Sequence, residues 1–199
     1  MTSDPRIQAI RRQLSGRAVA PLPRDGAAFE AGVLLAIRPR ADLELLVIER
    51  AEIEGDPWSG HMALPGGRRD VGDADLLATA LRETSEETGV VVPRDAVLGP
   101  LDEVRPRPNR LSPLVIAPFV GVVPAGTDAA PNPGEVERAL WVPLGLLNGD
   151  DAQREVQIDL PGGPRSFPSF AVQDRIIWGL THRILTQFLA VARAARVIT

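Results

Sequence analysis

Three glutamates crowd one short stretch of the sequence. Glu83, Glu86 and Glu87 end a helix-forming run that follows Pro65-Gly66-Gly67 and stops at Gly89, a residue suited to the left-handed position after a helix end. At about 100° per residue, Glu86 and Glu87 lie roughly 60° and 40° to either side of Glu83. The three carboxylates therefore share one helix face. We expect them at the edge of the buried side, which the spacing assigns to Leu76, Leu77, Ala80, Leu81, Thr84 and Thr88.

Such a cluster is unfavourable without cations. Like charges four residues apart destabilise a helix, and carboxylates near its C-terminus oppose the helix dipole. Hard oxygen ligands of this kind favour Mg²⁺ or Mn²⁺, which bind one or two carboxylates together with phosphate oxygens. A solvated acidic helix face is the alternative that three glutamates alone leave open.

The flanking residues favour the metal site, because the stretch resembles the Nudix box, G-x5-E-x7-R-E-U-x-E-E-x-G-U with U an aliphatic residue. The matching residues are Gly67, Arg82-Glu83, Glu86-Glu87 and Gly89-Val90. Two positions depart from the pattern. Asp73 stands in place of the first glutamate, with eight residues rather than seven before Arg82, and Thr84 fills an aliphatic position. We interpret the extra residue as a longer loop before the helix.

The resemblance implies a fold and a chemistry. The fold is an α/β/α sandwich with a mixed β-sheet, and the activity is metal-dependent hydrolysis of a diphosphate linkage in a small nucleotide. Glu83, Glu86 and Glu87 would hold Mg²⁺ or Mn²⁺, and Arg82 would orient a box carboxylate. Gly66 and Gly67 would let the backbone approach metal or phosphate closely.

Three segments outside the box resemble Nudix enzymes that hydrolyse coenzyme A. They are the strand ending in Glu49-Arg50, which is similar to the L-L-x-x-R ending of those enzymes, the S-G-H-M-A-L-P-G-G that carries His61 in place of glutamine, and the I-W-G-x-T around Trp178 and Gly179. The resemblance places Arg50 near the substrate. A surface salt bridge for Arg50, a structural role for His61 and plain helix packing for Trp178 remain alternatives. Trp58 is interpreted either as a base-stacking residue or as a loop anchor.

Basic residues lie at the start of the box and in a loop after it. Arg68, Arg69 and a Pro-rich loop with Arg105, Arg107 and Arg110 could receive the 3′-phosphate of coenzyme A, because a guanidinium suits phosphate. A solvated turn is the alternative for that loop. Glu135 is the first residue of an E-V-x-x-x-x-W-V-P-L element that resembles one of Nudix enzymes, where it would reach the metal cluster, act as a base or cap the next segment.

Composition limits the class of protein. The chain has 199 residues, 44% hydrophobic and 24% charged, which is ordinary for one soluble globular domain. A net charge of −4 argues against nucleic-acid binding. The absence of cysteine and the presence of only two histidines exclude disulfides, a thiol nucleophile and a thiolate metal site, and disfavour zinc. No apolar run spans a membrane, so we expect a cytoplasmic protein.

Periodicity predicts the remaining elements. Ile7, Ile10 and Leu14 indicate a helix over residues 3–16, capped by Ser3 or Asp4. Strands are predicted at 31–37, 43–48, 61–64, 97–104, 114–123 and 155–160, and a helix at 174–197 with Ile176 and Ile177 in its apolar stripe. We divide the chain into an N-terminal extension, 1–25, and one Nudix domain, 26–199. The oligomeric state stays open between monomer and homodimer.

Two classes of function fit these observations. The first is a pyrophosphohydrolase acting on coenzyme A or acyl-CoA, with ADP-ribose or another nucleoside diphosphate derivative as the alternative substrate. The second is a non-catalytic Nudix module that binds a nucleotide or a protein. The presence of Arg82 and all three helix glutamates favours the enzyme.

Overall fold

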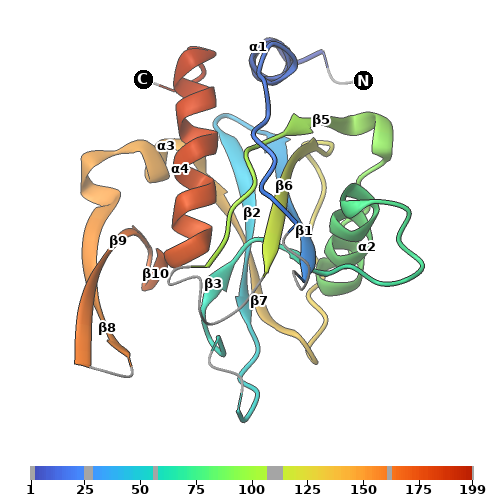
Figure 1. The fold of residues 1–199 in the computed structure, drawn as a ribbon. Helices are drawn as coiled ribbons and strands as arrows, with labels where there is room; N and C mark the ends of the chain where they lie inside the picture. The colour runs from blue at the N-terminus through green and yellow to red at the C-terminus, as the bar shows by residue number, and fades with distance from the viewer. Residues whose placement is uncertain (1–2, 25–28, 56–57, 107–113, 161–162, 199) are drawn as a thin grey trace.

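Two β-sheets and four α-helices organise the part of the chain that the computed structural model describes, residues 3–24, 29–55, 58–106, 114–160 and 163–198 (Figure 1). The helices are α1 (Pro5–Ser15), α2 (Leu76–Thr88), α3 (Leu144–Asn148) and α4 (Gly179–Ala194). The strands are β1 (Glu30–Pro39), β2 (Leu43–Arg50), β3 (Met62–Ala63), β4 (Gly66–Arg68), β5 (Val97–Pro100), β6 (Val115–Val122), β7 (Val136–Pro143), β8 (Gln153–Leu160), β9 (Gly163–Val172) and β10 (Arg175–Trp178).

The larger sheet is mixed. Its path among the described strands is β3-β2-β1-β6-β5, with β4 paired to β1 and β7 paired to β2. β1 runs antiparallel to β2 and β4 but parallel to β6. The hairpin predicted from residues 31–37 and 43–48 is therefore confirmed.

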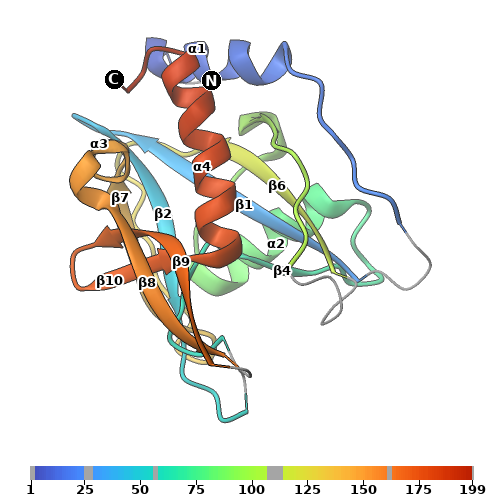
Figure 2. The same ribbon diagram turned by 60° about the vertical axis from the view of Figure 1, so that its left-hand side comes forward.

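Helices cover both faces of this sheet. Alternation along β1 sends Leu34 and Ala36 to the α2 side, and Leu35 and Ile37 to a larger cluster that α1 and α4 complete. Figures 1 and 2 show α2 on one side of the sheet and α4 on the other. The predicted sandwich with a mixed sheet is confirmed.

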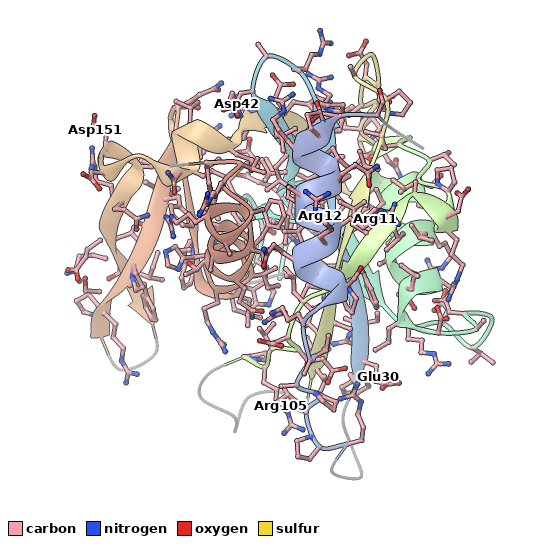
Figure 3. All side chains as sticks on the ribbon, turned by 90° about the horizontal axis from the view of Figure 1, so that it is seen from above. Arg11, Arg12, Glu30, Asp42, Arg105 and Asp151 are labelled. Carbon is pink, nitrogen blue, oxygen red and sulfur yellow. The ribbon has the colours of Figure 1, made fainter. Side chains whose placement is uncertain are left out.

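Helix α1 matches its prediction closely. The Asp4 side chain accepts a hydrogen bond from the Arg6 N–H at 2.8 Å, so Asp4 is the cap. Ile7, Ile10 and Leu14 are buried in the same core as the large sheet, and Figure 3 shows the helix from above, with Arg11 and Arg12 labelled. The division of the chain at residue 25 stays a prediction.

The buried face of α2 differs from its prediction. Leu77 and Leu81 are only half-buried, whereas the fully buried residues of this helix are small or polar: Thr79, Ala80, Thr84, Glu87 and Thr88. The reason is close packing on Gly32 of β1, where a Cβ would lie 2.1 Å from the Leu76 carbonyl oxygen. At that distance large apolar side chains do not fit beneath the helix. Gly89 takes the predicted left-handed conformation with φ 67°.

Two boundary predictions were wrong. Strand β5 ends at Pro100, and Val104 joins the sheet only by an isolated bridge to Ile116, because Asp102 and Glu103 turn to bind residues 17–24 after α1. The C-terminal helix begins at Gly179 rather than 174. Residues Arg175–Trp178 instead form β10, since Gly179 has φ 66° and breaks the helical pattern.

The second sheet, β10-β9-β8, was not predicted beyond its first strand. The buried Glu49 carboxylate ties it to the first sheet, because Glu49 accepts from Arg138 of β7 at 2.7 Å and from Arg175 of β10 at 2.8 Å.

Nothing among the described helices is both long and apolar enough to cross a membrane.

Candidate active site

Helix α2 holds the three predicted carboxylates. The Asp75 side chain caps its first turn by accepting from the Ala78 N–H at 2.8 Å. The carboxylates then differ in burial: Glu86 is half-exposed, Glu83 is largely covered, and Glu87 is 4% exposed. The exposure of the carboxylates therefore falls from Glu86 to Glu87 within one turn of the helix.

Glu87 is the most unusual group of the site. Its Oε2 accepts a hydrogen bond from the Gly66 N–H at 2.8 Å, which joins the end of α2 to the loop before it. Burial raises the pKa of Glu87 to about 7, and the neighbouring Glu83 and Glu135 carboxylates add to that rise, while the Gly66 N–H and the Arg50 charge oppose it. Burial likewise raises the pKa of Glu83, against the effect of Arg82.

The first two residues of β4, Gly66 and Gly67, meet these carboxylates. Gly66 has φ 148°, and a Cβ there would lie 2.4 Å from the Gly32 carbonyl oxygen. A Cβ at Gly67 would lie 2.4 Å from Cδ of Glu83. The backbone at these glycines thus lies directly against two of the carboxylates, and its close approach to metal or phosphate stays a prediction.

Arg82 is fixed by acidic partners on both sides. Its Nε and Nη2 bind Oδ1 and Oδ2 of Asp73 at 3.1 and 3.0 Å, and its guanidinium also reaches Glu83 at 3.0 Å and Glu86 at 2.7 Å. Asp73 is buried and also accepts from the Thr79 hydroxyl at 2.9 Å. The Arg82 hydrogen bonds hold the pKa of Asp73 well below its ordinary value. This geometry supports Arg82 as an orienting residue that Asp73 holds in place. The sequence analysis missed Thr79, because the box pattern specifies no residue at that position.

Sheet pairing brings Arg50 and Glu135 to the same place. Arg50 of β2 lies opposite Val136 of β7, and the Ala51 N–H donates to the Glu135 carbonyl at 2.9 Å. Both residues act electrostatically on Glu87, although they are far apart in the sequence. Glu135 is exposed, so it lies at the open side of the site.

Four rings gather beside Arg50. The Arg50 N–H donates to the His61 carbonyl at 3.1 Å, and the His61 ring lies 5.8 Å from Trp58 and 5.2 Å from Trp178. Trp178 also lies 5.2 Å from Phe167 of β9. Phe167 was missed because prolines at 164 and 168 obscure the strand pattern of β9. The helix-packing interpretation of Trp178 was wrong, since its backbone is extended at the end of β10.

The other arginines proposed from the sequence have partners outside the ring cluster and the three carboxylates of α2. Arg69 binds Glu30 at 3.2 Å and the Asp73 and Ala74 carbonyls, so it braces the loop before α2. The exposed Arg68 lies 4.6 Å over the Phe29 ring. Arg105 donates to the Pro23 carbonyl and lies at the same end of the molecule as Glu30 (Figure 3). Arg107 and Arg110 lie outside the described residues. Phosphate contacts by these arginines stay predictions.

The donor set fits a divalent cation. Within the described residues, no three His, Cys, Asp or Glu side chains are grouped as metal ligands, because Glu83 and Glu86 turn toward Arg82. Glu87 nevertheless carries a buried carboxylate whose ionised form is disfavoured by two further carboxylates. Oxygen donors with this excess of negative charge suit Mg²⁺ or Mn²⁺.

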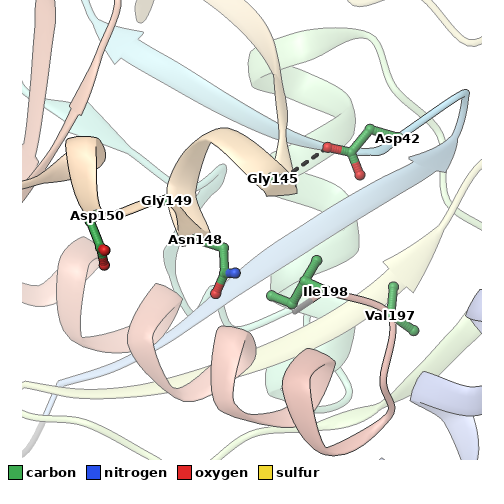
Figure 4. Close-up of a pocket in the computed structure, with 7 residues that line it drawn as sticks. All are labelled: Asp42, Gly145, Asn148, Gly149, Asp150, Val197 and Ile198. Carbon is green, nitrogen blue, oxygen red and sulfur yellow. Dashed lines mark hydrogen bonds between the residues drawn. The ribbon is translucent and has the colours of Figure 1, made fainter.

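A separate cleft of about 490 Å³ lies near the C-terminus (Figure 4). Its lining residues are Asp42, Gly145, Asn148, Gly149, Asp150, Val197 and Ile198. Asp42 accepts from the Gly145 N–H at 2.9 Å, which caps the short helix α3. None of the predicted site residues lines this cleft, so the chemistry is assigned to α2 and its loop.

A family model of the NUDIX domain matches residues 29–160, most of the chain. The chain belongs to the Nudix family. A Nudix hydrolase of Photorhabdus laumondii designated NudL is 31% identical over 157 residues, which cover 79% of this chain and 81% of that protein. An uncharacterised Schizosaccharomyces pombe protein is 36% identical over 119 residues, 58% of this chain but only 36% of the longer yeast protein. This Nudix protein is therefore a hydrolase of the pyrophosphohydrolase class.

Solved structures agree with the fold. A MutT/nudix family protein from Enterococcus faecalis has a TM-score of 0.61 at 17% identity, covering 97% of this chain and 75% of that one. The Nudix domain of Shewanella oneidensis NrtR, solved with ADP-ribose, has a TM-score of 0.50 at 23% identity, covering 59% and 74%. At these identities the likeness concerns the fold. Nudix hydrolases generally use divalent metal ions, in keeping with the carboxylates of α2.

Glu87→Gln should change how the stability of this Nudix hydrolase depends on pH in EDTA. The folded protein holds the Glu87 proton up to a pKa of about 7, whereas the unfolded chain loses it near 4.5, so the free energy of unfolding falls as pH rises between them. Urea unfolding measures the free energy of unfolding of both proteins at pH 5 and pH 8. From pH 5 to pH 8 the difference between variant and wild type should change in favour of the variant by up to about 3 kcal/mol. Mn²⁺ should reverse the gain at pH 8, and parallel pH curves for the two proteins would contradict the assignment.

Asp73→Asn should destabilise the protein and reduce turnover, because four donors that now meet a carboxylate would meet an amide instead: the Asp70 N–H, the Thr79 hydroxyl, and Nε and Nη2 of Arg82. We expect a loss of about 2 kcal/mol in urea unfolding at pH 7, below the range for fully buried pairs since Arg82 is partly exposed. Asp70→Asn is the matched control: Asp70 lies 3.7 Å from Arg82 but is 75% exposed, and its loss should stay below about 0.5 kcal/mol. Equal losses in the two variants would refute the orienting role of Asp73.

Proposed function

We propose that this Nudix hydrolase cleaves the diphosphate linkage of coenzyme A or an acyl-CoA, giving 3′,5′-ADP and the (acyl-)phosphopantetheine fragment. The proposal rests on the Nudix fold and on one observation about its site. The three segments that resemble coenzyme A hydrolases outside the box converge beside the box carboxylates.

The convergence runs through backbone and ring contacts. Arg50 and His61 are joined by a hydrogen bond, and the His61 ring contacts Trp178, which comes from the far end of the chain. Arg50 in turn acts on the charge of Glu87. Segments that unite at one site are more simply explained by a shared substrate than by separate packing roles.

The carboxylates of α2 carry the chemistry in this proposal. Glu83, Glu86 and Glu87 would hold Mg²⁺ or Mn²⁺, and the bound metal supplies neutralisation of the phosphate oxygens and a more acidic water. Arg82, fixed by Asp73, orients Glu83 and Glu86. One of the carboxylates, or Glu135 at the open side, accepts the proton of the attacking water. Gly66 and Gly67 leave room for phosphate against the backbone.

The expected setting follows from the substrate. The partner is a small nucleoside diphosphate derivative in the cytoplasm rather than nucleic acid or a membrane. Arg50 is proposed as a substrate contact, and Arg68, Arg105 and Arg107 as contacts to the 3′-phosphate. Arg69 is a weaker candidate, because Glu30 and two carbonyls occupy its donors.

Glu87→Gln should keep the fold and lower turnover about a hundredfold or more, the scale of removing one group that stabilises developing charge. The steady-state rate with saturating Mg²⁺ or Mn²⁺ measures this, with circular dichroism to check the fold. Glu155→Gln, an exposed glutamate on β8, serves as the control and should retain the wild-type rate. Near-wild-type turnover by Glu87→Gln would remove that carboxylate from the mechanism.

A substrate panel tests the assignment to coenzyme A. Coenzyme A, dephospho-CoA, ADP-ribose, NADH, diadenosine polyphosphate and a nucleoside triphosphate are compared by kcat/KM, with products identified by mass. We expect coenzyme A to exceed dephospho-CoA, because the latter lacks the 3′-phosphate that the arginines would contact. A preference for ADP-ribose would keep the family chemistry and discard the coenzyme A assignment.

A further inference from the structure

A row of half-exposed apolar side chains continues outward from the ring cluster along the second sheet. Trp178 of β10 and Phe167 of β9 are its inner members, and Val156 and Ile158 of β8 are its outer members. We call these four residues the apolar strip. Figures 1 and 2 show β8 and β9 as a ribbon that extends beyond the larger sheet.

Strand register places the strip on one face. Val156 pairs with Phe167, Ile158 pairs with Arg165, and both Arg154 and Trp178 pair with Ser169. Directly opposed residues of antiparallel strands share a face, as do alternate residues along a strand. The 5.2 Å separation of the Phe167 and Trp178 rings agrees with this placement.

The two faces of the second sheet have different neighbours. Phe170, on the opposite face, is buried and lies 4.5 Å from the His182 ring of α4. On the strip face, Trp58 and His61 contact the inner end through Trp178. Val156 and Ile158 stay half-exposed, so the strip ends in the open.

The strip begins at the reaction site. His61 is joined to Arg50, and Arg50 acts on Glu87, so a substrate with its diphosphate at α2 would meet the inner rings first. The strip straddles the end of the family match at residue 160, because Val156 and Ile158 lie just before that end and Phe167 and Trp178 lie beyond it. A surface at the edge of the shared domain suits selection among substrates rather than the shared chemistry.

We propose that the apolar strip binds the acyl chain of an acyl-pantetheine substrate and sets chain-length preference; this rests on the proposed function. The strip is narrow, with Phe167 opposite Val156 and the exposed Arg165 opposite Ile158, and it spans four residue steps along β9, about 13 Å. That shape fits an extended apolar chain better than a sugar or a flat base. Burying one methylene fully is worth roughly fourfold in binding, so a one-sided strip should give about twofold for each.

The first experiment measures KM for acetyl-CoA and octanoyl-CoA. The wild type should have a KM about tenfold or more lower for octanoyl-CoA, and Val156→Ser with Ile158→Ser should abolish that gain while leaving coenzyme A itself unaffected. Glu155→Ser with Gln157→Ser alters the other face of the same strand and should keep the gain. Equal KM values for the two chain lengths in the wild type, or loss of the gain in the control, would overturn the proposal.

A second experiment separates the strip from the hydrolase assignment. S-octanoyl-pantetheine, which has no diphosphate, is titrated while tryptophan fluorescence is followed, and Trp178→Phe identifies the reporting ring. Saturable binding by the wild type and its loss in the Val156/Ile158 variant would support the strip even if coenzyme A is not a substrate. No binding would overturn the strip while leaving hydrolysis of coenzyme A intact. A change from dimer to monomer in that variant, measured by light scattering, would instead make the strip an interface between copies and overturn the proposal.

Discussion

The buried carboxylate of Glu87 is the constraint on which the rest of this structure depends. An ionised carboxylate in the interior is unfavourable unless charge or hydrogen bonds compensate it. Here the compensation comes from the Gly66 N–H and the Arg50 charge, and further carboxylates work against it. The loop before α2, the end of β2 and the end of α2 must therefore meet at one point. A divalent cation would complete the compensation, which links the stability of the fold to its chemistry.

Arg82 solves a second electrostatic problem. Carboxylates that share one helix face repel each other. An arginine among them could form an ion pair with any one of them if its position were not fixed. Asp73 fixes two guanidinium nitrogens from outside the helix while Glu83 and Glu86 bind the same group, and Thr79 holds Asp73 in turn. Asp73 is shorter than the glutamate of the box pattern, and eight residues rather than seven separate it from Arg82. The contact with Arg82 forms nevertheless, because the loop before α2 places the carboxylate beside the guanidinium.

The second sheet adds a half-exposed apolar surface to the Nudix scaffold. Its inner end is fixed to the first sheet by Glu49, which binds an arginine from β7 and another from β10. This pairing places Trp178 beside His61 rather than in a helix. The carboxylates of α2 thus lie in the part of the chain that the family model matches, whereas Phe167 and Trp178 lie beyond it and join the ring cluster through long-range contacts.

The sequence by itself determined the features that local periodicity and spacing control. These include α1 with its Asp4 cap, the first hairpin, the glutamate face of α2 and the glycines at 66, 67 and 89. Tertiary structure decided the burial of Glu87, the Asp73–Arg82 contact, the meeting of Arg50 with Glu135 and the β10 strand. The physical reason is that burial depends on which distant strands pair. Ile176 and Ile177 fit both a helical stripe and a strand, and only pairing with β9 and the turn at Gly179 chose between them.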